Sequence, residues 1–201
     1  MLITTPTPAT LTAAAELLNS GGVVILPTDT VYGIAAHPAR PEAVERIRAI
    51  KGRAEDKPVA LLASGIQAVT AFGAAMPPAA QKLAAAYWPG AMTLVLPCGN
   101  SCEGFRVPDH AFALALLEAC GGTLRVTSAN LSGSMPALSA AAALRDVGLE
   151  ADMVIDGGVS PGGVASTVVR VSADGAIRIL REGAIAASAI ISCARIHSAF
   201  L

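Results

Sequence analysis

The chain of 201 residues has the length of one domain, and its formal net charge of −1 excludes a global field that would attract nucleic acid or an acidic membrane. Apolar residues make up 53% of the chain and aromatic residues only 3%, so the core has to be built from Ala, Val, Leu and Ile. No run reaches the roughly 18 apolar residues of a membrane span, and the start lacks the features of a signal peptide, so we expect a cytoplasmic protein with no membrane partner.

Taken in chain order, apolar spacing and Gly or Pro breakers predict strands alternating with helices. Helices are predicted at 8–18, 41–51, 66–72, 78–87, 112–120, 139–147 and about 187–197. Strands are predicted at 23–26, 32–36, 59–63, 92–96, 124–127 and 153–155, with a late β-hairpin of 167–171 and 176–180. Residues 97–104 are expected to form a loop before a brief extended stretch at 105–107. The pattern predicts an α/β fold with a mixed sheet in a single domain.

Three loops rich in small and hydroxyl residues adjoin the ends of predicted strands, at 28–30, 128–132 and 162–166. Small residues let backbone N–H groups approach an anion, and Ser or Thr hydroxyls complete such a cradle. None of the three has the Gly-x4-Gly-Lys-Ser/Thr pattern of a Walker ATPase. Turn and capping chemistry is the alternative interpretation of each loop taken alone.

Cationic side chains stand beside small or turn residues at several places along the chain, namely Lys51, Arg53, Lys57, Arg106 and Arg181. An Arg fork fits a phosphate or a carboxylate through two parallel hydrogen bonds. The alternatives are a solvated helix end for Lys51 and Arg53, and ordinary ion pairs for the other arginines.

Other kinds of site find little support. The three histidines (His37, His110 and His197) lack the spacing of a triad or a zinc site. Cys98 and Cys102 have the spacing of a metal-ligand pair, but no second pair follows, so we interpret all four cysteines as reduced thiols. The remaining inventory of cations, hydroxyls and backbone groups suits a reaction run by positioning and charge neutralisation, such as nucleotidyl transfer.

Seven short motifs together resemble the YrdC/TsaC family in its short bacterial form. In order they are PTDTVYG at 27–33, KGR at 51–53, WPG at 88–90, RVP at 106–108, SANLSG at 128–133, GVAST at 163–167 and LREG at 180–183. The resemblance covers about residues 23–185 and implies one YrdC-like domain over 1–201. Its motif-bearing core would span about 9–185, with a C-terminal helix at 187–197.

The resemblance implies a twisted mixed sheet around a basic cavity and the synthesis of threonylcarbamoyl-AMP and pyrophosphate from ATP, L-threonine and bicarbonate. The product would pass to a partner complex that modifies tRNA to threonylcarbamoyladenosine. Carried over by position, threonine would be held by Thr30, Arg106 and Ser166. ATP would be held by Lys51, Arg53, Lys57, Ser128, Asn130 and Arg181. Lys51 and Arg53 would be catalytic, and Mg²⁺ would arrive with the nucleotide without direct side-chain ligands.

The chain departs from the family pattern in four places. Ala165 replaces a usual Glu, Glu182 replaces a usual Pro, and Leu62 stands where longer members carry His. The segment 97–105 is about ten residues shorter than its usual counterpart, as judged against the family pattern. Two alternatives therefore stay open. One is a paralogue that makes a different acyl- or carbamoyl-adenylate, and the other is a non-catalytic binder of double-stranded RNA or tRNA, which the near-zero net charge disfavours.

Overall fold

The computed structural model describes residues 2–52 and 58–195. Its strands are β1 (Leu2–Thr4), β2 (Val24–Leu26), β3 (Gly33–Ala36), β4 (Leu61–Ala63), β5 (Met92–Cys98), β6 (Ser101–Arg106), β7 (Thr123–Ser128), β8 (Met153–Ile155), β9 (Thr167–Val171) and β10 (Ile177–Arg181). Its α-helices are α1 (Pro8–Asn19), α2 (Pro41–Lys51), α3 (Ile66–Ala71), α4 (Pro78–Tyr87), α5 (Ala111–Ala119), α6 (Ala140–Val147) and α7 (Ala187–Arg195), and a 3₁₀ turn, η1, spans Gly148–Glu150.

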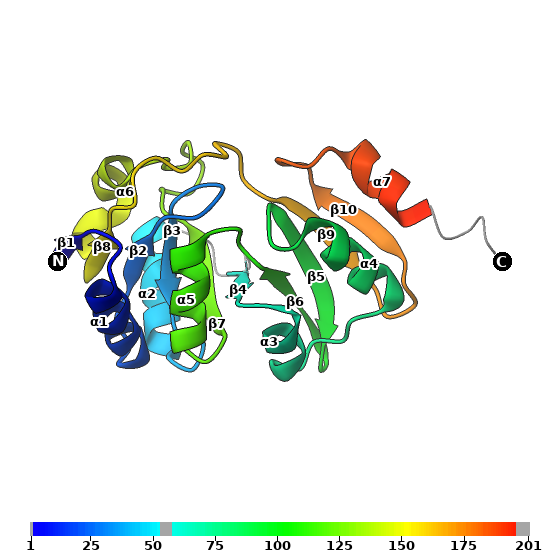
Figure 1. Cartoon of the computed structure of the whole chain (residues 1–201), viewed down its shortest axis with the longest axis horizontal. Coiled ribbons are helices and arrows are strands. Elements are labelled where there is room, and N and C mark those ends of the chain that lie inside the picture. Colours follow the sequence, from blue (N-terminus) through cyan, green and yellow to red (C-terminus); the bar gives the residue numbers. More distant parts are fainter. Residues whose placement is uncertain (1, 53–57, 196–201) are drawn as a thin grey trace.

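The ten described strands join into one sheet in the order β1-β8-β2-β3-β7-β4-β6-β5-β9-β10. The sheet contains parallel pairs, such as β2 with β8 and β5 with β9, and antiparallel pairs, such as β3 with β7 and β9 with β10. The predicted α/β class with a mixed sheet is therefore confirmed. Figure 1 shows that the sheet runs through two halves, with β1, β8, β2, β3 and β7 in one and β4, β6, β5, β9 and β10 in the other.

The first half is covered by helices on both faces. Side chains of a strand alternate between faces, so neighbouring residues of β2 enter different cores. Val24 and Leu26 pack with α1 and α5, whereas Ile25 packs with α2 and α6. Burying each of these side chains contributes roughly 1.5–3 kcal/mol.

The second half is covered by helices on one face. Met92, Leu94 and Leu96 of β5 are fully buried against a cluster that includes residues of α3, α4 and α7. The residues between them, Thr93 and Val95, point to the opposite face, where they line a cavity. The arrangement of helices thus leaves one face of this half available for a ligand.

Two segments differ from the sequence prediction. The expected loop at 97–104 is wrong, because β5 and β6 form an antiparallel hairpin with Cys98 opposite Ser101. Gly99 turns the chain with φ 56°, a left-handed value that glycine accepts without strain. The strand β1 was not predicted, since three residues carry too little pattern. The predicted end of the last helix, beyond Arg195, lies outside the described residues.

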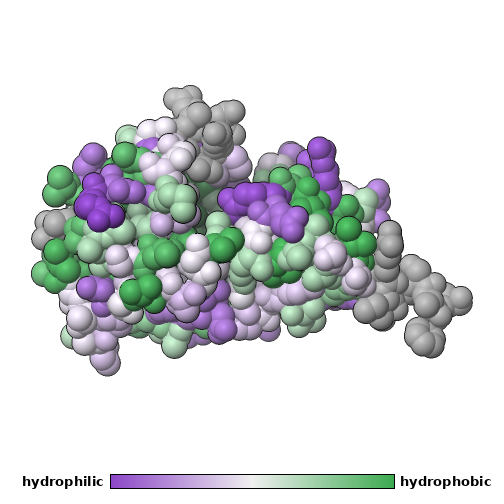
Figure 2. All heavy atoms as spheres, turned by 90° about the horizontal axis from the view of Figure 1, so that it is seen from above, coloured by the Kyte–Doolittle hydropathy of each residue, from purple (hydrophilic) through white to green (hydrophobic). Residues whose placement is uncertain are grey.

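The surface mixes polar and apolar residues. Seen from above, hydrophilic residues form separate patches with apolar residues between them (Figure 2). Such a mixed surface is normal for a chain with this apolar content. Among the described residues, no helix combines the length and apolar character that a membrane crossing requires.

Candidate functional site

A cavity of about 350 Å³ lies on the open face of the second half and reaches the edge of the first. Its floor is formed by β4, β6, β5 and β9, with Leu62, Gly104, Val95 and Val168 among the lining residues. Its first-half wall includes Thr30 and Ser128. The volume is in the usual range for a small-molecule site.

The turn after β2 is held by the buried Thr28 hydroxyl. This oxygen accepts hydrogen bonds from the backbone N–H groups of Thr30 (3.2 Å) and Val31 (3.3 Å) and donates to the Val31 carbonyl (2.7 Å). Backbone N–H groups of Gly162 and Gly163 donate to the carbonyls of Asp29 and Thr30, both at 3.0 Å. The loops predicted at 28–30 and 162–166 therefore lie side by side.

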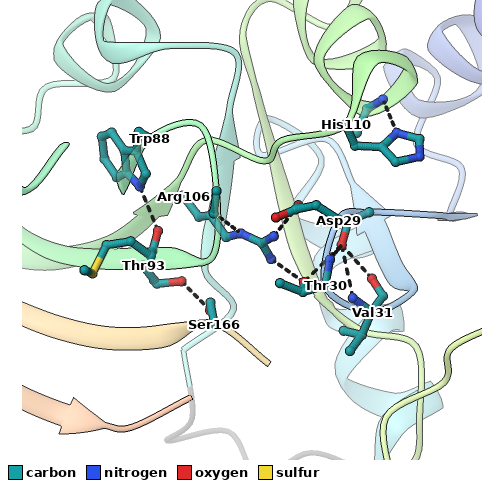
Figure 3. Close-up of polar contacts among 12 residues, drawn as sticks. Asp29, Thr30, Val31, Trp88, Thr93, Arg106, His110 and Ser166 are labelled. Carbon is teal, nitrogen blue, oxygen red and sulfur yellow. Dashed lines mark hydrogen bonds and ion pairs between the residues drawn. The ribbon is translucent and has the colours of Figure 1, made fainter. Parts of the chain in front are cut away.

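Arg106, at the end of β6, meets this turn (Figure 3). Its Nη1 donates to the Thr30 hydroxyl at 2.7 Å, its Nη2 pairs with the Asp29 carboxylate, and its Nε donates to the Gly90 carbonyl at 2.9 Å. These bonds use three of the five N–H groups of the guanidinium. Burial lowers the pKa of Arg106 and the Asp29 carboxylate opposes that shift, so the group stays a cation held in one orientation.

Hydroxyl groups form the next part of the cavity. Thr93 Oγ1 and Ser166 Oγ lie 2.7 Å apart, and both residues are buried. Arg181, at the end of β10, also lines the cavity and donates from Nη2 to the Ser166 carbonyl at 2.7 Å. The cavity thus combines two arginines with several hydroxyls, which suits an anionic ligand that also has hydrogen-bonding groups.

The loop 128–132 is braced by a buried lysine. The Lys51 ammonium donates to the carbonyls of Ser128 and Asn130, the latter at 2.5 Å. The Asn130 amide in turn donates to the carbonyls of Leu131 (2.8 Å) and Ser134 (2.9 Å). Asn130 Oδ1 is buried without a hydrogen-bond partner, so it can accept one from a ligand donor.

His110 stands near Asp29 in Figure 3. Its Nδ1 accepts from the Ala113 backbone N–H at 3.3 Å, which caps the first turn of α5. Burial lowers the pKa of His110, and the Asp29 carboxylate opposes the shift. The neutral ring therefore serves the helix cap.

A sequence model described as "Telomere recombination", that of the Sua5/YciO/YrdC family, matches residues 16–183. The chain belongs to this family.

Known members of the Sua5/YciO/YrdC family resemble the chain over most of its length. It is 36% identical over 183 residues to the threonylcarbamoyl-AMP synthase of Bacillus subtilis. That match covers 86% of this chain and 53% of the Bacillus subtilis protein. It is 38% identical over 155 residues to the threonylcarbamoyl-AMP synthase of Halorhodospira halophila, covering 72% of this chain and 81% of that protein. The chain thus spans about half the length of the first relative and most of the second.

A solved family structure, Pyrococcus abyssi Sua5 complexed with L-threonine, superposes with a TM-score of 0.89 at 30% identity. The match covers 96% of this chain and 60% of that one.

The structure of the 201-residue chain brings together most of the residues that its sequence singled out. Thr30, Arg106, Ser166, Ser128 and Arg181 all line the cavity. Lys51 and Asn130 meet at the loop beside it, with their side-chain nitrogens donating to backbone carbonyls. Arg53 and Lys57 lie outside the described residues.

All four departures from the family pattern lie in the part of the chain that the structure describes. Leu62 and Ala165 line the cavity. The Glu182 carboxylate accepts from the Ala187 backbone N–H at 3.3 Å, at the first residue of α7. The shortened segment is the β5–β6 hairpin.

Two residues of the site were missed by sequence reasoning. Thr93 lies in a mainly apolar strand. The only sequence signal is its position between Met92 and Leu94, because alternate residues of a strand point to opposite faces. Asp29 was noted as part of the turn, yet its ion pair with Arg106 joins residues 77 positions apart and has no local signal.

The cysteines show no paired arrangement. All four are free, and Pro97, not Cys98, lies opposite Cys102, so Cys98 and Cys102 point to opposite faces of the hairpin. Burial raises the pKa of Cys120 to about 11, which keeps that thiol protonated. Within the described residues, no three His, Cys, Asp or Glu side chains are grouped to hold a metal ion.

Proposed function

We propose that the protein is a threonylcarbamoyl-AMP synthase, which joins L-threonine, bicarbonate and ATP to give threonylcarbamoyl-AMP and pyrophosphate. The observation that carries this proposal is the cluster of Arg106, Thr30 and Ser166 in a cavity of ligand size. It occurs in a chain that matches the family over residues 16–183 and resembles a structure complexed with L-threonine. An amino acid carboxylate and a hydroxyl group are ligands that this cluster can bind.

Threonine would bind where Arg106 meets the Thr30 turn. The guanidinium is already oriented by Asp29 and the Gly90 carbonyl, so its two remaining N–H groups are fixed in direction. A carboxylate that binds there meets a group that loses little further entropy, which favours affinity. Ser166, just before β9, and its partner Thr93 on β5 supply hydroxyls.

ATP would bind along the loop 128–132 and Arg181. Lys51, Arg53 and Lys57 would neutralise charge as pyrophosphate leaves, a contribution worth about 2–4 kcal/mol per contact in the transition state. A phosphate oxygen at this loop would compete with the carbonyls that now accept from Lys51. Asn130 Oδ1 would accept from a nucleotide N–H group.

Mg²⁺ would accompany the nucleotide. Mg²⁺ is usually held by one or two carboxylates, waters and substrate phosphates rather than by a cage of protein ligands. The acidic residue nearest the cluster, Asp29, is already paired with Arg106. The residues described here fit an ion carried mainly by the phosphates of ATP.

The test is an omission assay that measures pyrophosphate release with ATP, threonine and bicarbonate together and with each left out. We expect release only with all three present. Full release without threonine would favour the second candidate, a paralogue that adenylates a different acyl group, to which Leu62 and Ala165 in the cavity lining point. No release together with tight, salt-sensitive RNA binding would favour a non-catalytic RNA binder.

The product is a reactive mixed anhydride and requires a partner that consumes it. We propose that it passes in the cytoplasm to a tRNA threonylcarbamoyl-transfer complex. Direct contact between this chain and tRNA can be tested by the same measurement of salt-sensitive RNA binding.

A further inference from the structure

Two exposed arginines face each other on the β9–β10 hairpin. Arg178 lies directly opposite Arg170 in the register of the two antiparallel strands. Side chains of such a pair share one face and lie side by side. Like charges in this position repel each other and weaken a hairpin, so the arrangement is costly unless something else stabilises it.

The arginine pair shares the face of the cavity. Val95 of β5 lies opposite Arg170 and lines the cavity, as does Val168, two residues before Arg170 on β9. Arg170 Nη2 contacts Cys102 Sγ at 3.5 Å, and Cys102 stands two residues before the cavity residue Gly104 on β6. The Arg170 side chain therefore crosses β5 on the cavity side.

A β-bulge adds a third arginine to the same face. In a regular strand, residues 178 and 181 point to opposite faces because the side-chain period is two. The register shifts between Ile179 and Arg181, which places Arg181 opposite Val168 and directs it into the cavity lining. Bulges commonly re-aim a side chain in this way. The three arginines thus form a track from the cavity to the outer part of the hairpin.

This arginine track (Arg170, Arg178 and Arg181) has no acidic partner in the part of the chain that the structure describes. The ion pairs there involve Arg46, Arg48, Arg106 and Arg125 instead. Arg170 Nη2 donates to the sulfur of Cys102, and Arg181 donates to a backbone carbonyl. An anion between the guanidinium groups would relieve their repulsion and gain charge-assisted hydrogen bonds.

We propose that the arginine track binds inorganic pyrophosphate and serves as its route out of the cavity, an inference that rests on the proposed function. From Arg170, opposite Arg178, to Val168, opposite Arg181, the track covers two residue steps of β9, roughly 7 Å at about 3.3 Å per residue. That length fits a diphosphate group, whereas double-stranded RNA is bound over about 16 base pairs. Arg181 receives the leaving group at the cavity, and Arg170 and Arg178 bind it next.

The direct test is calorimetric titration of the chain with inorganic pyrophosphate, which needs no turnover. We expect Arg170→Gln/Arg178→Gln to bind pyrophosphate about tenfold more weakly than the unmodified chain. The matched control is Arg145→Gln, another exposed arginine, on α6 in the other half of the molecule. It should bind as the unmodified chain does. Pyrophosphate should also raise the melting temperature of the unmodified chain more than that of the double variant.

Equal pyrophosphate affinity in the unmodified chain and the double variant would overturn the proposal, as would no binding by the unmodified chain at millimolar pyrophosphate. If the double variant no longer bound a 20-base-pair RNA duplex but bound pyrophosphate as the unmodified chain does, the proposal would be overturned in favour of an RNA contact. If the omission assay detects no synthesis but the double variant loses pyrophosphate binding, the proposed function fails and the anion site stands. Melting curves confirm folding, since removing like charges should not destabilise the hairpin.

Discussion

At the scale of single residues, Arg106 carries the most specific expectation. Its guanidinium contacts three different groups, Asp29, Thr30 and the Gly90 carbonyl. A lysine at this position keeps the charge but has no fork. We expect Arg106→Lys to raise the threonine KM by roughly ten- to a hundredfold, on the order of 1.4–2.8 kcal/mol, with ATP dependence nearly unchanged. Steady-state kinetics with threonine varied at saturating ATP measures this.

Arg125→Lys is the matched control for that change. Arg125 forms a similar fork, with Nη1 and Nη2 donating to the Glu103 carboxylate at 2.6 and 3.0 Å, but it does not line the cavity. Loss of this fork in Arg125→Lys should lower the free energy of unfolding and leave the threonine KM unchanged. If both lysine variants gave the same threonine KM as the unmodified chain, Arg106 would be an ion-pair residue only.

Asn130 has two separable roles in the loop 128–132. Its amide N–H groups brace the loop, and its Oδ1 is an unpartnered buried acceptor. Asn130→Ala removes two hydrogen bonds of about 1 kcal/mol each, so the melting temperature should fall by several degrees. It should also weaken ATP much more than threonine. Calorimetry beside a thermal melt separates the roles, and unchanged ATP affinity would leave only the brace.

The residue types at the site could be predicted from sequence better than their contacts. Small, hydroxyl and cationic residues near strand ends singled out the loops of Thr30 and Ser166 and the side chain of Arg106. The family resemblance then favoured a ligand role over turn chemistry or an ordinary ion pair. The pairing of Arg106 with Asp29 depends on how β6 meets the turn after β2, which no local pattern encodes. Contact of Lys51 with phosphate stays a prediction, and the donation of its ammonium to loop carbonyls has no local signal in the sequence.

At the scale of elements, the segment after β10 is fixed against the start of β9. The Thr167 hydroxyl accepts from the backbone N–H groups of Gly183 (2.9 Å) and Ile185 (3.0 Å) and donates to the Ile185 carbonyl (2.7 Å). A side chain on Gly183 would overlap the Ala165 carbonyl oxygen. This close approach holds Ser166 and Arg181 next to each other at the cavity.

Gly183→Ala is therefore expected to disturb the cavity as well as the fold. Backbone, and not a flexible side chain, occupies the space, so the segment has to move away from Ala165 and Ser166. We expect a loss of about 1–3 kcal/mol in the free energy of unfolding, measured in urea, with weaker threonine and ATP binding. Gly175→Ala, at a hairpin turn with open space around it, controls for glycine loss at a position strained only by its φ of 83°. A Gly183→Ala variant that is less affected than Gly175→Ala would contradict the close approach.

Elements with long periodic patterns were predicted well, and short or irregular ones were not. Helices such as α1 and α4 begin at a proline and show a clear apolar face, which sequence alone reveals. The strand β6 contains Ser101, Glu103 and Gly104, so its apolar alternation is broken. It forms because β5, β4 and the Arg125–Glu103 ion pair hold it in place, and these are contacts at long range.

At the scale of the whole molecule, the two halves are joined along one seam. Antiparallel pairing of β4 with β7 connects them, and Leu62 packs into the core of the first half while Leu61 packs into that of the second. The Arg106–Asp29 and Arg125–Glu103 ion pairs cross the same seam. The cavity lies along it, so a bound ligand contacts both halves at once.

This seam predicts that the halves unfold together and that ligands stabilise both equally. Trp88, the one tryptophan of the chain, reports on the second half, where its ring N–H donates to the Met92 carbonyl at 2.7 Å. Cys120, buried in the core of the first half, reports there through thiol labelling once the other three cysteines are replaced by Ser. The two urea midpoints should coincide. Threonine and ATP at a hundred times their Kd should shift both midpoints equally, by an amount that corresponds to about 2.7 kcal/mol in the free energy of unfolding for each ligand that binds only the folded state. Midpoints that separate, or a ligand shift seen by Trp88 fluorescence alone, would mean that the cavity belongs to the second half and that the seam does not couple the two.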